Sequence, residues 1–219
     1  MVIFLFLQLP SGVFSIFYHF RLAKTSKKQA DDAALSFILG VEIFTTIAWL
    51  LTYIIMFCCD TNITATPFAW VMAGVCFAEA IAVLFFYFRR GKSSTALFIS
   101  RRTAKGLRNY AKNIKNRSDA VLLGFISCLP ELLFTLPLYI ICSAFLQSES
   151  VAPRAIIIIL AIIVSIIPLF VIRTLFRTDK NLADIERLRI KLKPHFRIII
   201  FLAYLALALS LINYAIINM

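Results

Sequence analysis

Three glutamates lie inside long apolar stretches of the sequence, where an ionised side chain is costly. They are Glu42 in "GVEI", Glu79 in "FAEA" and Glu131 in "LPEL", and no lysine or arginine shares their stretches. At the centre of a bilayer an unpaired charge costs several kcal/mol, so each carboxyl must be protonated, face water or hold a cation. All three are therefore candidates to bind a cation substrate or a coupling proton. The alternative is structural: protonated glutamates that join helices by hydrogen bonds.

Two cysteines precede two of these glutamates by three residues, Cys76 before Glu79 and Cys128 before Glu131. Residues three apart lie on one face of a helix. A mixed sulfur and oxygen set suits zinc or cadmium, whereas carboxylates alone suit manganese, magnesium, sodium or protons. Cys76 and Cys128 are thus candidate metal ligands, although buried cysteines also serve as small hydrophobic residues. No resident cofactor is predicted.

The elements that must hold these residues are predicted from hydropathy. The chain has 219 residues, of which 61% are hydrophobic. A membrane-spanning helix needs roughly 20 mostly apolar residues, and long runs without alternation favour helices over the strands of a barrel. We predict an all-α integral membrane protein, a single domain over 1–219 with six transmembrane helices. The spans are expected at about 2–20, 34–58, 68–88, 120–146, 155–173 and 197–217.

The basic residues predict how these helices are oriented. Of 23 lysines and arginines, 22 fall in or beside three alternate connections, 21–33, 89–119 and 174–196. Because such residues are retained on the cytoplasmic side, we predict that both termini lie on the non-cytoplasmic side of the cell or plasma membrane. The same distribution explains the net charge of +12 by contact with anionic headgroups, with no nucleic acid as partner.

Two of the basic connections also carry helical patterns. Leu107, Tyr110 and Ile114 share one face within 101–117, and apolar positions recur through 178–193, which Pro194 is expected to end. We predict amphipathic helices at the inner leaflet, which either pack on the membrane or dock a cytoplasmic partner.

The long connection at 89–119 divides the six spans into three plus three, which is compatible with an inverted repeat. "LPSGVF" from Leu9 and "LPELLF" from Leu129 share the pattern LPxxxF at an offset of 120 residues. Pro10 and Pro130 both fall near the predicted midplane, and Pro137 follows in the same span as Pro130. A proline there kinks a helix and frees carbonyls that can line a cavity, although kinks also serve packing alone.

The layout of the whole chain, in its size, six spans and three-plus-three division, resembles the lysine-exporter-type superfamily. Members tend to be rich in glycine in their first span, whereas this sequence has Gly12 beside Pro10 in "LPSG". The resemblance implies export of a small solute and carries over no residue role.

We therefore predict a secondary transporter of a small solute or cation, whose midplane glutamates bind a cation or a proton. The rival is a non-transporting scaffold, assembly factor or sensor that presents its basic helices, and a channel is a third reading. The motifs of zinc proteases, serine hydrolases and phosphate-binding loops are absent from the sequence, so no enzymatic activity is predicted. A homo-oligomer is compatible with all three readings.

Overall fold

All regular structure in the described part of the chain is helical, which confirms the predicted all-α class. Four described helices are long and apolar enough to cross a membrane, as in an integral membrane protein. Pro10 and nearly all of the predicted first span lie outside the described residues. The computed structural model describes residues 16–17, 20, 27–58, 66–87, 106–107, 109–111, 113–114, 116–129, 132–147, 150–177 and 182–218.

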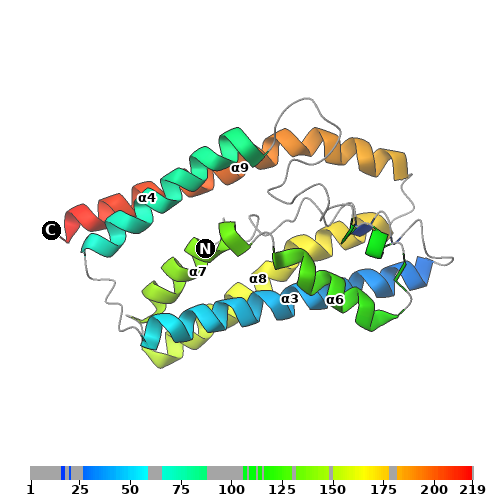
Figure 1. The fold of residues 1–219 in the computed structure, drawn as a ribbon, viewed down its shortest axis with the longest axis horizontal. Coiled ribbons are helices and arrows are strands. Elements are labelled where there is room, and N and C mark those ends of the chain that lie inside the picture. The colour runs from blue at the N-terminus through cyan, green and yellow to red at the C-terminus, as the bar shows by residue number, and fades with distance from the viewer. Residues whose placement is uncertain are drawn as a thin grey trace.

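The elements, labelled as in Figure 1, are α3 (Lys27–Cys58), α4 (Thr66–Ala82), the π-helix η1 (Val83–Tyr87), α6 (Arg117–Cys128), α7 (Leu132–Gln147), α8 (Val151–Arg177) and α9 (Leu182–Ile217). Local sequence explains several of their boundaries. Pro67 is the second residue of α4, where a fixed φ and a missing N–H cost nothing. Asn116 caps α6, and its backbone N–H donates to the Asp119 carboxylate at 3.3 Å.

Two predicted helices have different bounds in the structure. The predicted span 120–146 comprises two helices, since α6 ends at Cys128 and α7 begins at Leu132. The expected stop at Pro194 is wrong, because α9 runs from Leu182 to Ile217 through that residue. A proline removes one backbone hydrogen bond, and the backbone hydrogen bonds of the flanking turns are enough to continue the helix.

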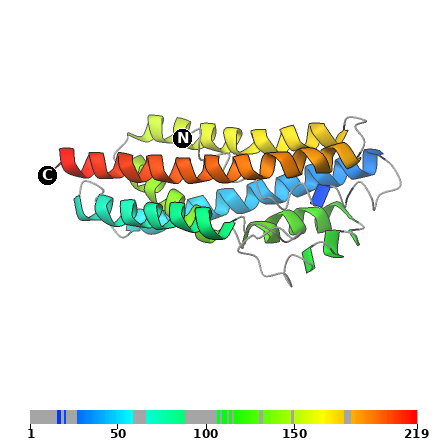
Figure 2. The same ribbon diagram turned by 90° about the horizontal axis from the view of Figure 1, so that it is seen from above.

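The helices form two packed groups, seen from two directions in Figures 1 and 2. In the first group α3 packs against α6, α7 and α8; in the second, α4 and η1 lie along α9. Helix α7 also contacts α4 and so joins the groups. Both long pairs, α3–α8 and α4–α9, are antiparallel, since contacts at one end join the start of one helix to the end of the other.

In the core of the first group, α3 and α6 approach each other unusually closely. A Cβ added at Gly40 would meet the backbone of Val121, and one added at Gly124 would meet the carbonyl of Phe37. Small residues permit such crossings between membrane helices. Phe37 also stacks edge-to-face with Phe17 from the N-terminal region, so the predicted first span contributes to this core.

The second core is built from small residues on α4 against α9 and α7. Ala73, Cys76 and Ala80 are buried on one face of α4, and Tyr204 on α9 is 1% exposed. Large aliphatic side chains point outward instead, as on α8 at Ile156 and Ile163. Lipid is the solvent that suits such an exterior.

Candidate functional site: polar contacts along two helix pairs

Three polar contacts join α3 to α8 at regular intervals. On α3 they involve Asp31, Glu42 and Tyr53, which are spaced by 11 residues each. Eleven residues make about three helical turns, so these positions lie on one face. The three side chains that meet them on α8 are Arg173, Ser165 and Arg154, in reverse order along the chain.

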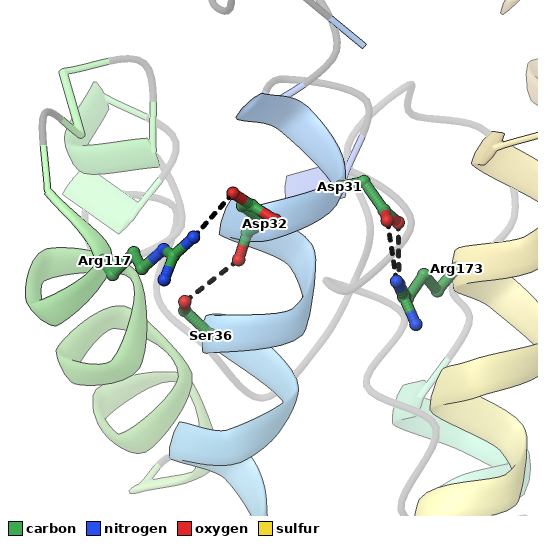
Figure 3. Close-up of polar contacts among 5 residues, drawn as sticks. All are labelled: Asp31, Asp32, Ser36, Arg117 and Arg173. Atoms are coloured by element: carbon green, nitrogen blue, oxygen red, sulfur yellow. Dashed lines mark hydrogen bonds and ion pairs between the residues drawn. The ribbon is translucent and has the colours of Figure 1, made fainter. Parts of the chain in front are cut away.

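At one end the contact is an ion pair (Figure 3). Arg173 donates from Nε to Oδ1 of Asp31 and from Nη2 to Oδ2, both at 2.7 Å. The two side chains are only 14% and 21% exposed, and the Arg173 guanidinium also lies 5.6 Å from the Phe170 ring centroid. Two parallel charge-assisted bonds fix both the distance and the orientation of the helices.

A second ion pair at the same end joins α3 to α6. Arg117 Nη2 donates to Asp32 Oδ2 at 2.8 Å, and the Ser36 hydroxyl donates to the backbone carbonyl of Asp32 at 2.9 Å. Arg117 is 77% exposed, so solvent weakens this pair relative to Asp31–Arg173. Adjacent aspartates thus direct α3 toward two different helices, as Figure 3 shows.

The middle contact places the predicted site residue Glu42 against Ser165. The Ser165 Oγ lies 3.1 Å from Oε1 and 3.0 Å from Oε2 of Glu42. Ser165 is buried, and Pro168 is buried one turn further along α8. Within the described part of the chain, no basic side chain contacts Glu42.

At the other end Arg154 holds α8 to α3 and to the end of α7. Its Nη1 donates to the Tyr53 hydroxyl oxygen at 2.6 Å, and its Nη2 donates to the Gln147 carbonyl at 3.2 Å. The guanidinium also lies 5.8 Å from the centroid of the Tyr53 ring. This cation therefore has both a polar and an aromatic contact with the same tyrosine.

The second pair, α4–α9, carries its own carboxyl. The hydroxyl of Tyr204 on α9 hydrogen-bonds to the Glu79 carboxyl. The buried Oε2 of Glu79 has no hydrogen-bond partner. Glu79 is followed one turn later by η1, and π-helical turns are frequent at functional sites.

The predicted site residues therefore fall in different places. Glu42 and Glu79 face different partner helices, Pro137 is buried inside α7, and Glu131 and Pro130 lie beyond the described ranges. Cys128 is buried in the α3–α6 core, whereas Cys76 is buried between α4 and α9.

Metal ligation by Cys76 and Cys128 stays a prediction. Among the described side chains, no group of three or more His, Cys, Asp or Glu could hold a metal ion. The Cys128 thiol is engaged with the Gly124 carbonyl at 3.4 Å. Glu131, the carboxyl expected beside it, is not among the residues that the structure describes.

A groove of about 380 Å³ runs along α8, and the described residues that line it all belong to that helix. Its lining is Ile163, Ile166, Ile167, Phe170, Val171 and Thr174. It is almost wholly apolar and faces outward, so it suits a lipid chain better than a charged solute.

Comparisons with protein-family models, curated proteins and solved structures found no match for this chain. The class that the fold defines is an all-helical protein with helices long enough to cross a membrane.

Proposed function

We propose that this protein is a secondary membrane transporter of a small solute or cation, in which carboxyls near mid-membrane bind the cation or a coupling proton. One observation carries the proposal. Glu42 lies halfway along α3 and Glu79 lies within α4, and each meets a hydroxyl on the facing helix in place of a basic side chain. A carboxyl at that depth must exchange a proton or a cation to become charged.

We further propose six spans arranged as a three-plus-three inverted repeat, with both termini on the non-cytoplasmic side. The α3–α8 contacts support the repeat. Asp31 and Arg154 are 123 residues apart, as are Glu42 and Ser165, and Tyr53 and Arg173 are 120 apart. We call the line of contacts from Asp31–Arg173 through Glu42–Ser165 to Tyr53–Arg154 the seam. Helices related by a two-fold axis in the membrane plane would place equivalent residues at opposite ends of such a seam.

In this mechanism the contacts at the two ends of α3 act as closures on either side of Glu42. Opening one side requires the Asp31–Arg173 pair to separate, and opening the other requires Arg154 to leave Tyr53. Rocking of one half against the other would break them alternately and expose the carboxyls to each side in turn.

Flux into proteoliposomes tests the proposal. Vesicles loaded with a pH-sensitive dye are given imposed gradients of Na⁺, Mg²⁺, Mn²⁺ or Zn²⁺, and proton movement is recorded. We expect flux above that of protein-free vesicles, lost in the triple variant Glu42→Gln, Glu79→Gln, Glu131→Gln. Glu149→Gln, which lies between the predicted spans, is the matched control and should retain it.

Full flux in the triple variant would show that these carboxyls are not the site. Absence of flux with every probe, together with a cytoplasmic partner lost on deletion of 101–117 or 178–193, would favour the scaffold or sensor. Single-channel conductance would favour the channel.

A further inference from the structure

Ser165 has one hydroxyl hydrogen, so it cannot donate to the Ile162 carbonyl and to Glu42 at the same time. The Ser165 Oγ lies 2.7 Å from the Ile162 carbonyl oxygen, and 3.0 Å and 3.1 Å from the two oxygens of Glu42. A hydroxyl has one hydrogen, a carbonyl has none, and an ionised carboxylate has none. The shortest contact is to Ile162, which is the common local bond of a helical serine.

With its hydrogen directed at Ile162, Ser165 presents lone pairs to Glu42. A carboxylate in that position would repel them, whereas a carboxylic acid donates its own hydrogen to Oγ. We infer that Glu42 and Ser165 form a proton-binding site, with hydrogen bonds running from protonated Glu42 to Ser165 and on to the Ile162 carbonyl. The role of this proton in coupling rests on the proposed function, but the site itself does not.

The surroundings of Glu42 favour the acid. The titratable or charged residues on the helices packed against α3 are Arg117, Asp119 and Cys128 on α6, Tyr139 and Cys142 on α7, and Arg154, Arg173 and Arg177 on α8. Arg154 and Arg173 do not contact Glu42, because each is bound at an end of the seam, and Arg177 lies about three turns beyond Ser165 along α8. On α3 itself Asp31 and Tyr53 are three turns away in either direction. A carboxylate here would have no counter-charge among the described residues.

Loss of the proton changes the hydrogen bonds without changing the partners. When Glu42–COOH releases H⁺ to water, the Ser165 hydroxyl turns from the Ile162 carbonyl to the carboxylate. The Glu42 carboxylate then accepts a hydrogen bond from the Ser165 hydroxyl on α8. The Ile162 carbonyl keeps its backbone hydrogen bond within the helix. Ser165 is thus a positioning residue that can serve either state of Glu42.

Infrared difference spectroscopy of the full chain in lipid nanodiscs tests this site without reference to transport. At neutral pH we expect a protonated-carboxyl C=O band that is lost in Glu42→Gln. In Ser165→Ala the band should shift to higher frequency because its hydrogen bond is lost, and Ser165→Thr should restore it. Glu79→Gln is the matched control, in which the band assigned to Glu42 remains.

Two infrared results would contradict the proposed proton site. If Glu42→Gln removes only carboxylate bands at neutral pH, or if Ser165→Ala leaves the acid band in place, the inference is overturned. If the Glu42 acid band is present but the protein transports none of the tested ions or protons, the proton site is supported and the transporter proposal is wrong. If flux depends on the glutamates but the acid band is absent, the transporter proposal is supported and the proton site is wrong.

Discussion

The pairs α3–α8 and α4–α9 place a glutamate in the same kind of setting but bind it differently. Both oxygens of Glu42 lie within hydrogen-bonding distance of Ser165, whereas Glu79 is bonded to Tyr204 and keeps a buried oxygen without a partner. The α3–α8 pair also has polar contacts at both ends. The difference indicates a carboxyl held between anchored helix ends in one pair, and a carboxyl with an unpartnered buried oxygen in the other.

The largest expected effect comes from comparing a glycine in each of the two helix groups. Gly124→Ala on α6 places a methyl group against the Phe37 carbonyl, so we expect a loss of about 1–3 kcal/mol in unfolding free energy. Gly74→Ala on α4 is the matched control, since nothing lies within 4 Å of its added Cβ. It should be neutral or gain up to about 1 kcal/mol from helix propensity. Unfolding in mixed micelles with increasing SDS measures both.

Equal effects at Gly124 and Gly74 would contradict the close approach of α3 to α6. A stabilised Gly124→Ala would do so more strongly, because only an open site allows alanine to help.

The next effect compares the two ion pairs at the same end of α3. In a double-mutant cycle with Asp31→Asn and Arg173→Gln we expect a coupling of about 1–3 kcal/mol, because the pair is bidentate and mostly shielded from solvent. The parallel cycle with Asp32→Asn and Arg117→Gln should give less than about 1 kcal/mol. Thermal unfolding in detergent at low and high salt measures each cycle.

Salt should reduce the smaller coupling more than the larger one. Couplings of equal size, or a stronger Asp32–Arg117 pair, would mean that α6 rather than α8 anchors this end of α3.

Most of the described helices were predictable because each depends on a continuous local pattern, and the positions of Glu42 within α3 and Glu79 within α4 follow directly from it. Their partners were not, because the meeting of Glu42 with Ser165 depends on which helices pair and on how each is rotated about its axis. Pairing is set by packing among residues far apart in sequence, such as Gly40 and Gly124.

Two features of the sequence could have indicated the ends of the seam. Asp31 and Asp32 are adjacent acids in a connection otherwise rich in cations, and Arg154 is the one basic residue of 23 that lies neither in nor beside the three basic connections. A residue that departs from the local charge pattern is a candidate for a specific contact between helices. Counted only for orientation, these charges do not identify the residues that they bind.

The smallest expected effect compares the remaining ends of the two pairs. Tyr53→Phe keeps the ring beneath Arg154 but removes the hydroxyl that accepts its 2.6 Å bond, so we expect a loss of about 1 kcal/mol in unfolding free energy. Thr66→Val removes an exposed 3.5 Å contact to the Asn218 carbonyl and should cost less than about 0.5 kcal/mol. SDS unfolding of both variants beside the parent protein measures the difference. A larger cost at Thr66 would mean that α4–α9 is the more firmly closed pair, and Glu79 rather than Glu42 would then be the carboxyl held between fixed ends.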